Sequence, residues 1–119
     1  MATPNIVNVA TINAKNATGA VTTSRASAVD VAADKVAKIN TILIANIDGS
    51  NAADITIEVS VDNGSNYVAI GSTISVPADA TLSFLENPIY LDETDLLAVT
   101  ASANSDLTYF VSYEELNDA

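Results

Sequence analysis

The sequence contains no histidine, no cysteine and no tryptophan, and only four of its 119 residues are basic. Without histidine or cysteine, the usual nucleophile–base pairs of covalent catalysis are excluded. Disulfides and thiolate metal sites are excluded as well. With four Tyr and two Phe, the chain also has few aromatic rings on which a sugar could stack. The missing residue types argue against an enzyme and predict no cofactor.

Positive charge is scarce. Fifteen acidic residues give a net charge of −11, and nucleic acids require Lys and Arg to neutralise phosphate. No segment approaches the roughly 18 apolar residues of a membrane span, and the N-terminus lacks the regions of a signal peptide. We therefore expect neither nucleic acid nor membrane as a partner. The acidity favours solubility, with docking on a basic partner as the alternative.

The residues that are abundant favour β-structure. Twelve Val, eleven Ile and twelve Thr outnumber eight Leu, and β-branched side chains fit a pleated sheet. The clearest segment runs from Asp54 to Ile70. Aliphatic residues alternate with polar ones from Ile55 to Val61, and Asn63-Gly64 then predicts a type I′ hairpin turn.

Residues 36–47 predict a long central strand that is apolar on both faces. Strict alternation places Ile39, Leu43 and Ile47 on one face, and Val36, Ile42 and Ile44 on the other. We expect another element or another subunit to cover the second face.

Further strands are predicted around residues 74–76, 81–85, 88–91, 97–103 and 107–113. Seven to nine short strands at this spacing predict an all-β fold, a single antiparallel β-sandwich of Ig-like or jelly-roll-like type. Residues 1–35 are expected to form edge strands or an extended arm, with a small polar break at residues 13–18. Residues 36–119 are expected to form the sandwich core, within one domain overall.

Two acidic turns offer oxygen ligands for Ca²⁺. One consists of Asp48, Asn51 and Asp54, and the other of Asp92, Glu93 and Asp95. Asp and Asn also occur in turns for backbone reasons alone, and we favour that explanation for both. We therefore predict no metal site.

Three regions are candidates to meet a neighbouring protein. The first is the second apolar face of the central strand, with Ile42 and Ile44. The second is the face that bears Phe110, opposite Tyr109 and Tyr113. The third is the N-terminal segment, with the apolar residues Ile6, Val7 and Val9.

The order of these segments resembles the small β-sandwich virion structural proteins of tailed bacteriophages, including those of marine and cyanobacterial phages. The resemblance covers roughly residues 36–116. It is carried by residues 38–46, by the alternating strand 55–61 with its Asn-Gly turn, by Val76-Pro77-Ala78 before Thr81-Leu82, by Leu91 with residues 95–102, and by residues 111–116.

The resemblance implies a virion structural protein, assembled in the host cytoplasm and present as a homo-oligomer on the particle. The partners that it implies are the major capsid protein or other virion proteins. We expect a capsid decoration (cement) protein on the outer capsid surface. The alternatives are a neck or tail protein of the phage and, from another class, a carbohydrate-binding or adhesive module.

Overall fold

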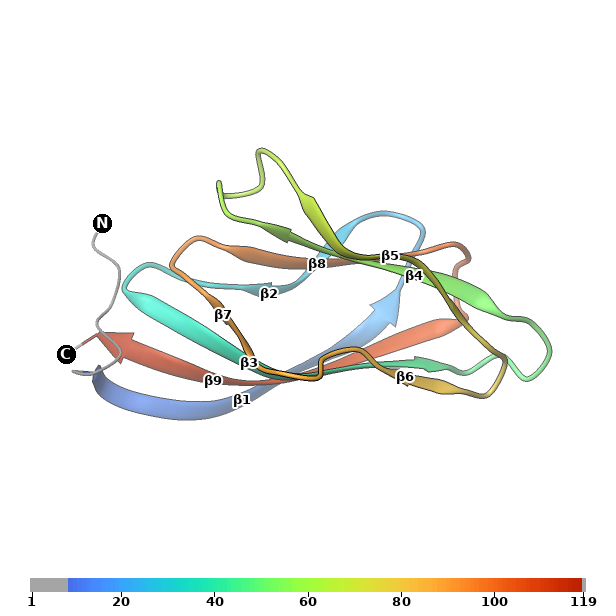
Figure 1. The fold of residues 1–119 in the computed structure, drawn as a ribbon, viewed down its shortest axis with the longest axis horizontal. Coiled ribbons are helices and arrows are strands. Elements are labelled where there is room, and N and C mark those ends of the chain that lie inside the picture. Colours follow the sequence, from blue (N-terminus) through green and yellow to red (C-terminus); the bar gives the residue numbers. More distant parts are fainter. Residues whose placement is uncertain (1–8, 119) are drawn as a thin grey trace.

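The computed structural model describes residues 9–118, and the side chains of residues 10–117. These residues form nine antiparallel strands in two packed sheets, which confirms the predicted β-sandwich (Figure 1). The first sheet has the order β1 (Val9–Val21), β9 (Leu107–Asp118), β3 (Lys35–Asn46) and β6 (Thr81–Ser83), and β7 (Ile89–Leu91) also pairs with β3. The second has the order β2 (Ala26–Asp30), β8 (Leu96–Ala101), β4 (Ala53–Ser60) and β5 (Val68–Val76).

The two sheets face each other across a core of aliphatic side chains. Strands β3 and β9 are interior strands of the first sheet, and β8 and β4 are interior strands of the second. Each contributes residues that are at most 1% exposed: Ile39, Ile42, Ile44, Ile55, Ile57, Leu97, Val99, Leu107 and Val111. As predicted for the last strand, Tyr109 and Tyr113 pack against this core on the side of Leu107 and Val111.

A β-bulge in β3 overturns the predicted faces of the central strand. Opposite β9, the register shifts between Ile39 and Thr41, so that Asn40 is an extra residue. A bulge of this kind changes which residues face inward. Ile39 therefore lies on the same face as Ile42 and Ile44, and all three are completely buried. Strict alternation across residues 36–47 was the wrong assumption.

The Asn-Gly turn has the predicted backbone conformation, within a longer loop than predicted. Asn63 and Gly64 have φ of 58° and 89°, as a type I′ turn requires. The amide of Ser65 donates to the carbonyl of Asp62 at 3.4 Å. Strand pairing, however, reaches only to Val59 opposite Val68. The alternation also ends early, because Val61 is 72% exposed.

The N-terminal region forms a continuous strand where a polar break was predicted. Residues 13–18 lie inside β1, each paired with a residue of β9. Small polar side chains are compatible with this edge position, because one face of β1 needs no apolar cover. Val21 and Val29 belong to the common core, so residues 9–35 and the remainder form one packed unit. Ile6 and Val7 lie outside the described residues.

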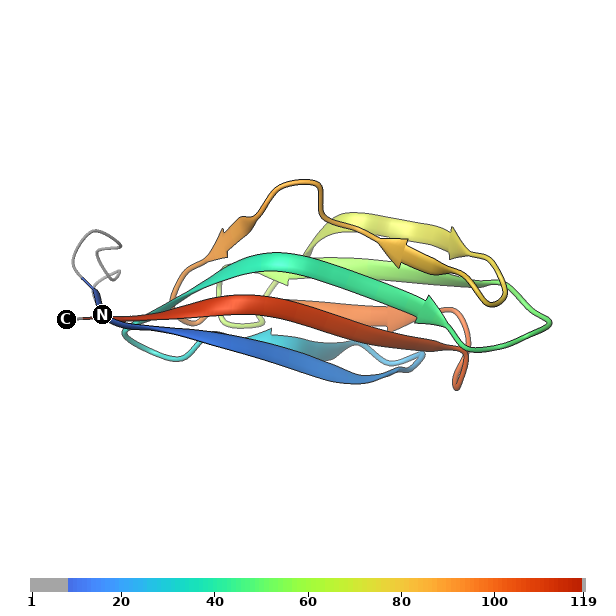
Figure 2. The ribbon, with the colours of Figure 1, turned by 90° about the horizontal axis from the view of Figure 1, so that it is seen from below.

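One side of the sandwich is closed by Phe84, in the connection between β6 and β7. The amide of Phe84 donates to the carbonyl of Ile42 at 2.9 Å, and its ring packs against the core. The ring also lies on Gly71 of β5. A Cβ atom added at Gly71 would come within 2.5 Å of Phe84 Cε1 and 3.0 Å of Ile74 Cδ1. Phe84 thus links the edges of the two sheets. The connection between β6 and β7 lies on the same side of the sandwich as β5 (Figure 2).

We expect Gly71→Ala to lower the free energy of unfolding by about 1–3 kcal/mol, because the added methyl group displaces the Phe84 ring from its packed position. Urea denaturation measures the change. Gly49→Ala is the control, since its added Cβ meets only the Asp79 carboxylate, at an ordinary 3.6 Å. Equal stability of the two variants would contradict the proposed contact.

Candidate interaction surface

The carboxylate of Asp48 binds its own turn. Its Oδ1 accepts hydrogen bonds from the amides of Ser50 at 2.8 Å and Asn51 at 3.2 Å, and its Oδ2 accepts one from Asn51 Nδ2 at 3.2 Å. These bonds, that from Ser50 foremost, lower the pKa of Asp48. Asp54 lies in β4, where its amide donates to Ser102 Oγ. The first acidic turn is therefore a hydrogen-bonded connection between β3 and β4.

The second acidic turn is held in the same way. Asp95 Oδ2 accepts a hydrogen bond from the amide of Asp92 at 2.9 Å, and Glu93 Oε2 accepts one from the amide of Asp34 at 2.8 Å. Burial raises the pKa of Asp95. In the part of the chain that the structure describes, no three His, Cys, Asp or Glu side chains are grouped to hold a metal ion.

Part of the outer face of the second sheet, over β8, is covered by the chain itself. Leu96 and Ala98 of β8 are 8% and 0% exposed. The β4–β5 loop lies close by, since a Cβ added at Gly64 would be 3.3 Å from Leu96 Cδ1. Arg25 binds both carboxylate oxygens of Glu58, at 2.8 and 3.0 Å, and its guanidinium lies 4.1 Å from the centre of the Tyr67 ring.

The outer face of the first sheet carries Phe110 near its middle. Phe110 is 38% exposed, and it lies between Thr18 of β1 and Leu43 of β3. The neighbouring rows of this face are small and uncharged; they consist of Asn16, Ser112 and Thr41 on one side, and Ala20, Thr108 and Ala45 on the other. Because Phe110 is an exposed aromatic residue on an interior strand, we treat this face as the candidate interaction surface and call it the open face.

The candidate interface residues fall into three groups. Ile42 and Ile44 are 0% exposed in the core, so their prediction as partner contacts was wrong, and the cause is the bulge at Asn40. Val9 is the first residue of β1 and pairs with Asp118. Phe110 lies on the candidate surface, where its role as a contact remains a prediction.

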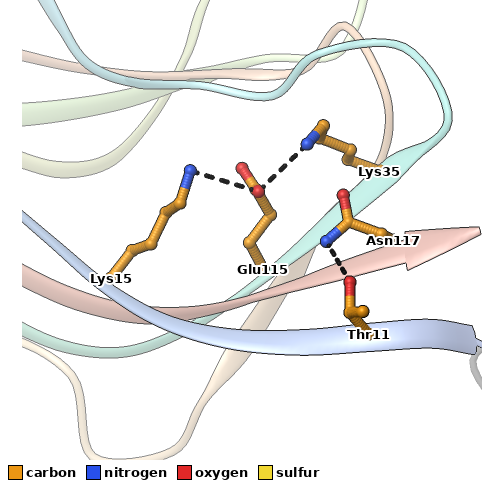
Figure 3. Close-up of polar contacts among 5 residues, drawn as sticks. All are labelled: Thr11, Lys15, Lys35, Glu115 and Asn117. Atoms are coloured by element: carbon orange, nitrogen blue, oxygen red, sulfur yellow. Dashed lines mark hydrogen bonds and ion pairs between the residues drawn. The ribbon is translucent and has the colours of Figure 1, made fainter.

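A cluster of opposite charges joins the strands of the first sheet at the end of the core. Lys15 Nζ and Lys35 Nζ lie 3.2 and 3.1 Å from Glu115 Oε1, and nearby Asn117 Nδ2 donates to Thr11 Oγ1 at 2.8 Å (Figure 3). Burial by itself would raise the pKa of Glu115, but the hydrogen bonds from Lys35 and Lys15 outweigh it and lower the pKa. One carboxylate thereby connects β9 to both of its neighbours.

Acidic residues are unevenly distributed along the chain, which the overall composition does not show. Every Asp and Glu occurs at or after Asp30, whereas Lys15 and Arg25 both precede it. The fold collects this acid-free segment on one side, because β1 and β2 are edge strands of the two sheets. Counting charges segment by segment in the sequence would have identified the part of the chain before Asp30 as free of acidic side chains.

No helix among residues 9–118 is long and apolar enough to cross a membrane. No family model matches the sequence, and the search of curated proteins likewise finds no match.

Among solved structures, the chain is similar to a pentameric capsid protein isolated from metagenomic phage sequences. The two are 11% identical, with a TM-score of 0.43. The match covers 95% of this chain and 63% of the capsid protein, so the chain spans less than two thirds of that protein's length.

Replacing Glu115 should make stability depend less on pH. Since the folded-state pKa of Glu115 is lowered, its contribution is present above the unfolded-state pKa and is lost as pH falls through the folded-state pKa. We expect Glu115→Gln to lower the free energy of unfolding at pH 7 by about 0.5–1 kcal/mol, given the partial exposure of both lysines.

Urea denaturation at pH 7 and at pH 3 measures this difference, which should shrink at the lower pH. Glu114→Gln is the control, because its Oε1 accepts a hydrogen bond from Asn40 Nδ2 that a glutamine oxygen also accepts. If Glu115→Gln lowered the free energy of unfolding by the same amount at both pH values, the ion-pair explanation would be contradicted.

Proposed function

We propose that this chain is a virion structural protein of a tailed bacteriophage, and that it decorates the outer capsid surface through the open face of its first sheet. The sequence resemblance over residues 36–116 supports the class of protein. The observation that carries the choice of surface is a difference between interior strands. In the second sheet, loop 61–67 lies over β8, and the exposed Val68 belongs to the edge strand β5. In the first sheet, Phe110 is exposed on the interior strand β9.

The composition of the open face suits protein binding. The centre of a protein interface is depleted in charge and often contains an aromatic residue that dominates the binding energy. Phe110 has that position, and the rows beside it carry only small uncharged side chains. The nearest charged pair, Lys38 and Glu114, occupies facing positions of opposite sign. Removing water from this face on binding therefore costs little free energy relative to the area that is buried.

Mass spectrometry of purified particles tests the proposed function. Detection at a copy number comparable to that of the major capsid protein would support a decoration protein. A copy number equal to that of a single symmetric ring would overturn decoration in favour of a neck or tail location. Absence from particles would overturn the virion role altogether.

We expect Phe110→Ser to reduce binding to capsids that lack the protein by about tenfold or more, the loss typical of removing a central aromatic contact. Sedimentation of the protein with those capsids measures occupancy. Val68→Ser is the matched control, because Val68 is 65% exposed on β5 of the other sheet. Equal loss of binding by both variants would contradict the assignment of the face.

A further inference from the structure

Three of the four sheet edges carry features that prevent another strand from pairing. Edge strands are commonly protected by short length, bulges, proline or charged side chains. Strand β2 has five residues, with a register shift between Ser27 and Val29. The pairing of β5 is shifted twice, and Thr73 within it has a φ of 51°. Strands β6 and β7 have three residues each and are separated by a connection that contains Pro88.

The edge of β1 lacks the first three of these features over most of its length, and its one charged side chain, Lys15, is paired with Glu115. Its only register shift lies between Val9 and Thr11. From Thr11 to Val21, eleven consecutive residues pair with β9 in unbroken register. Among residues 9–118, no strand pairs with the opposite edge of this stretch. Its backbone groups are therefore arranged to accept another extended strand.

The side of the sandwich that contains β1 is also the place where two acidic chains can approach. Residues 9–29 contain no carboxylate. Their two basic side chains already bind carboxylates of the same chain, Lys15 to Glu115 and Arg25 to Glu58. An acidic partner would have to compete for these cations. A second copy of this chain would meet a surface without excess charge of either sign.

We propose that β1 pairs antiparallel with β1 of a second copy, about a two-fold axis at Asn16. Because an isologous interface applies the same strand twice, pairing of the whole stretch from Thr11 to Val21 is centred on its middle residue, Asn16. The larger side chains of one copy then lie opposite small ones of the other. The facing pairs are Ile12 with Ala20, Asn13 with Gly19, Ala14 with Thr18 and Lys15 with Ala17.

This register joins the first sheets of two copies into one continuous sheet. No like charges face each other in it, since Lys15 lies opposite Ala17. Two side-chain amides meet at the axis, where Asn16 faces its symmetry mate. The open faces that bear Phe110 then continue from one copy to the next. The pairing does not depend on the proposed virion role, because it concerns the purified chain in solution.

Analytical ultracentrifugation of the purified chain over a range of concentrations gives the first test. We expect a reversible dimer. A monomer at every concentration would overturn the proposal, and so would an open polymer or an odd-numbered ring, because a two-fold edge contact closes at two copies.

A pair of charge variants tests the register. In Ala14→Lys/Thr18→Lys, the two new lysines face each other across the interface, and the dimer dissociation constant should rise about tenfold. In Ala14→Lys/Thr18→Glu, opposite charges face each other, and dimerisation should be restored. Lysine is chosen at position 14 because Glu114 of β9 lies beside it in the same chain.

General charge repulsion predicts the opposite order for these variants. The double-lysine variant has the smaller net negative charge and should then associate more strongly. A dimer that persists in the double-lysine variant would overturn the proposal. Thermal unfolding of both variants, at a concentration where both are monomeric, confirms that the fold is retained.

Because the chain has no cysteine, single cysteines report the axis directly. Facing residues of an antiparallel pair have Cα atoms about 4.5–5.5 Å apart, within disulfide range. Asn16→Cys should therefore form a covalent dimer on mild oxidation. Ala20→Cys, on the same face of β1, should not, since its symmetry mate is about 26 Å away. Equal cross-linking of the two variants would overturn the proposed register.

Discussion

The burial of β3 against the second sheet is the constraint on which the rest of the structure depends. Ile39, Ile42 and Ile44 are all completely buried, although strict alternation would separate the first from the other two. The extra residue Asn40 brings them to one face. Its side chain then lies outside the core, where Nδ2 donates to Glu114 Oε1 at 3.1 Å. Strands β9, β6 and β7 all pair with β3.

This packing determines which surfaces remain for partners. The inner faces of both sheets form the core, and the chain's own loop covers the part of the second sheet's outer face over β8. The outer face around Phe110 and the regular edge of β1 are both exposed, and they lie side by side because β1 and β9 are neighbours. We propose the first surface for binding to the particle and the second for pairing with another copy of the chain.

The sequence alone was sufficient to predict the class of fold and the conformation of its clearest turn. Alternation across Ile55 and Ile57 and the conformation of Asn63-Gly64 follow from local rules that the structure obeys. The bulge at Asn40 could not be predicted, because it is selected by the register with β9, a strand that is distant along the chain. For the same reason the polar residues of β1 did not identify it as a strand. β1 is a strand because its backbone pairs with β9, and this pairing does not require an apolar pattern within β1 itself.

The central claim is that the first sheet, through β1 and the face around Phe110, meets neighbouring proteins. Hydrogen–deuterium exchange tests it most directly, by comparing the chain bound to particles with the dilute free chain. The account predicts new protection of backbone amides in β1 and β9, with exchange unchanged in the β4–β5 loop and β5. New protection confined to that loop and β5 would contradict it.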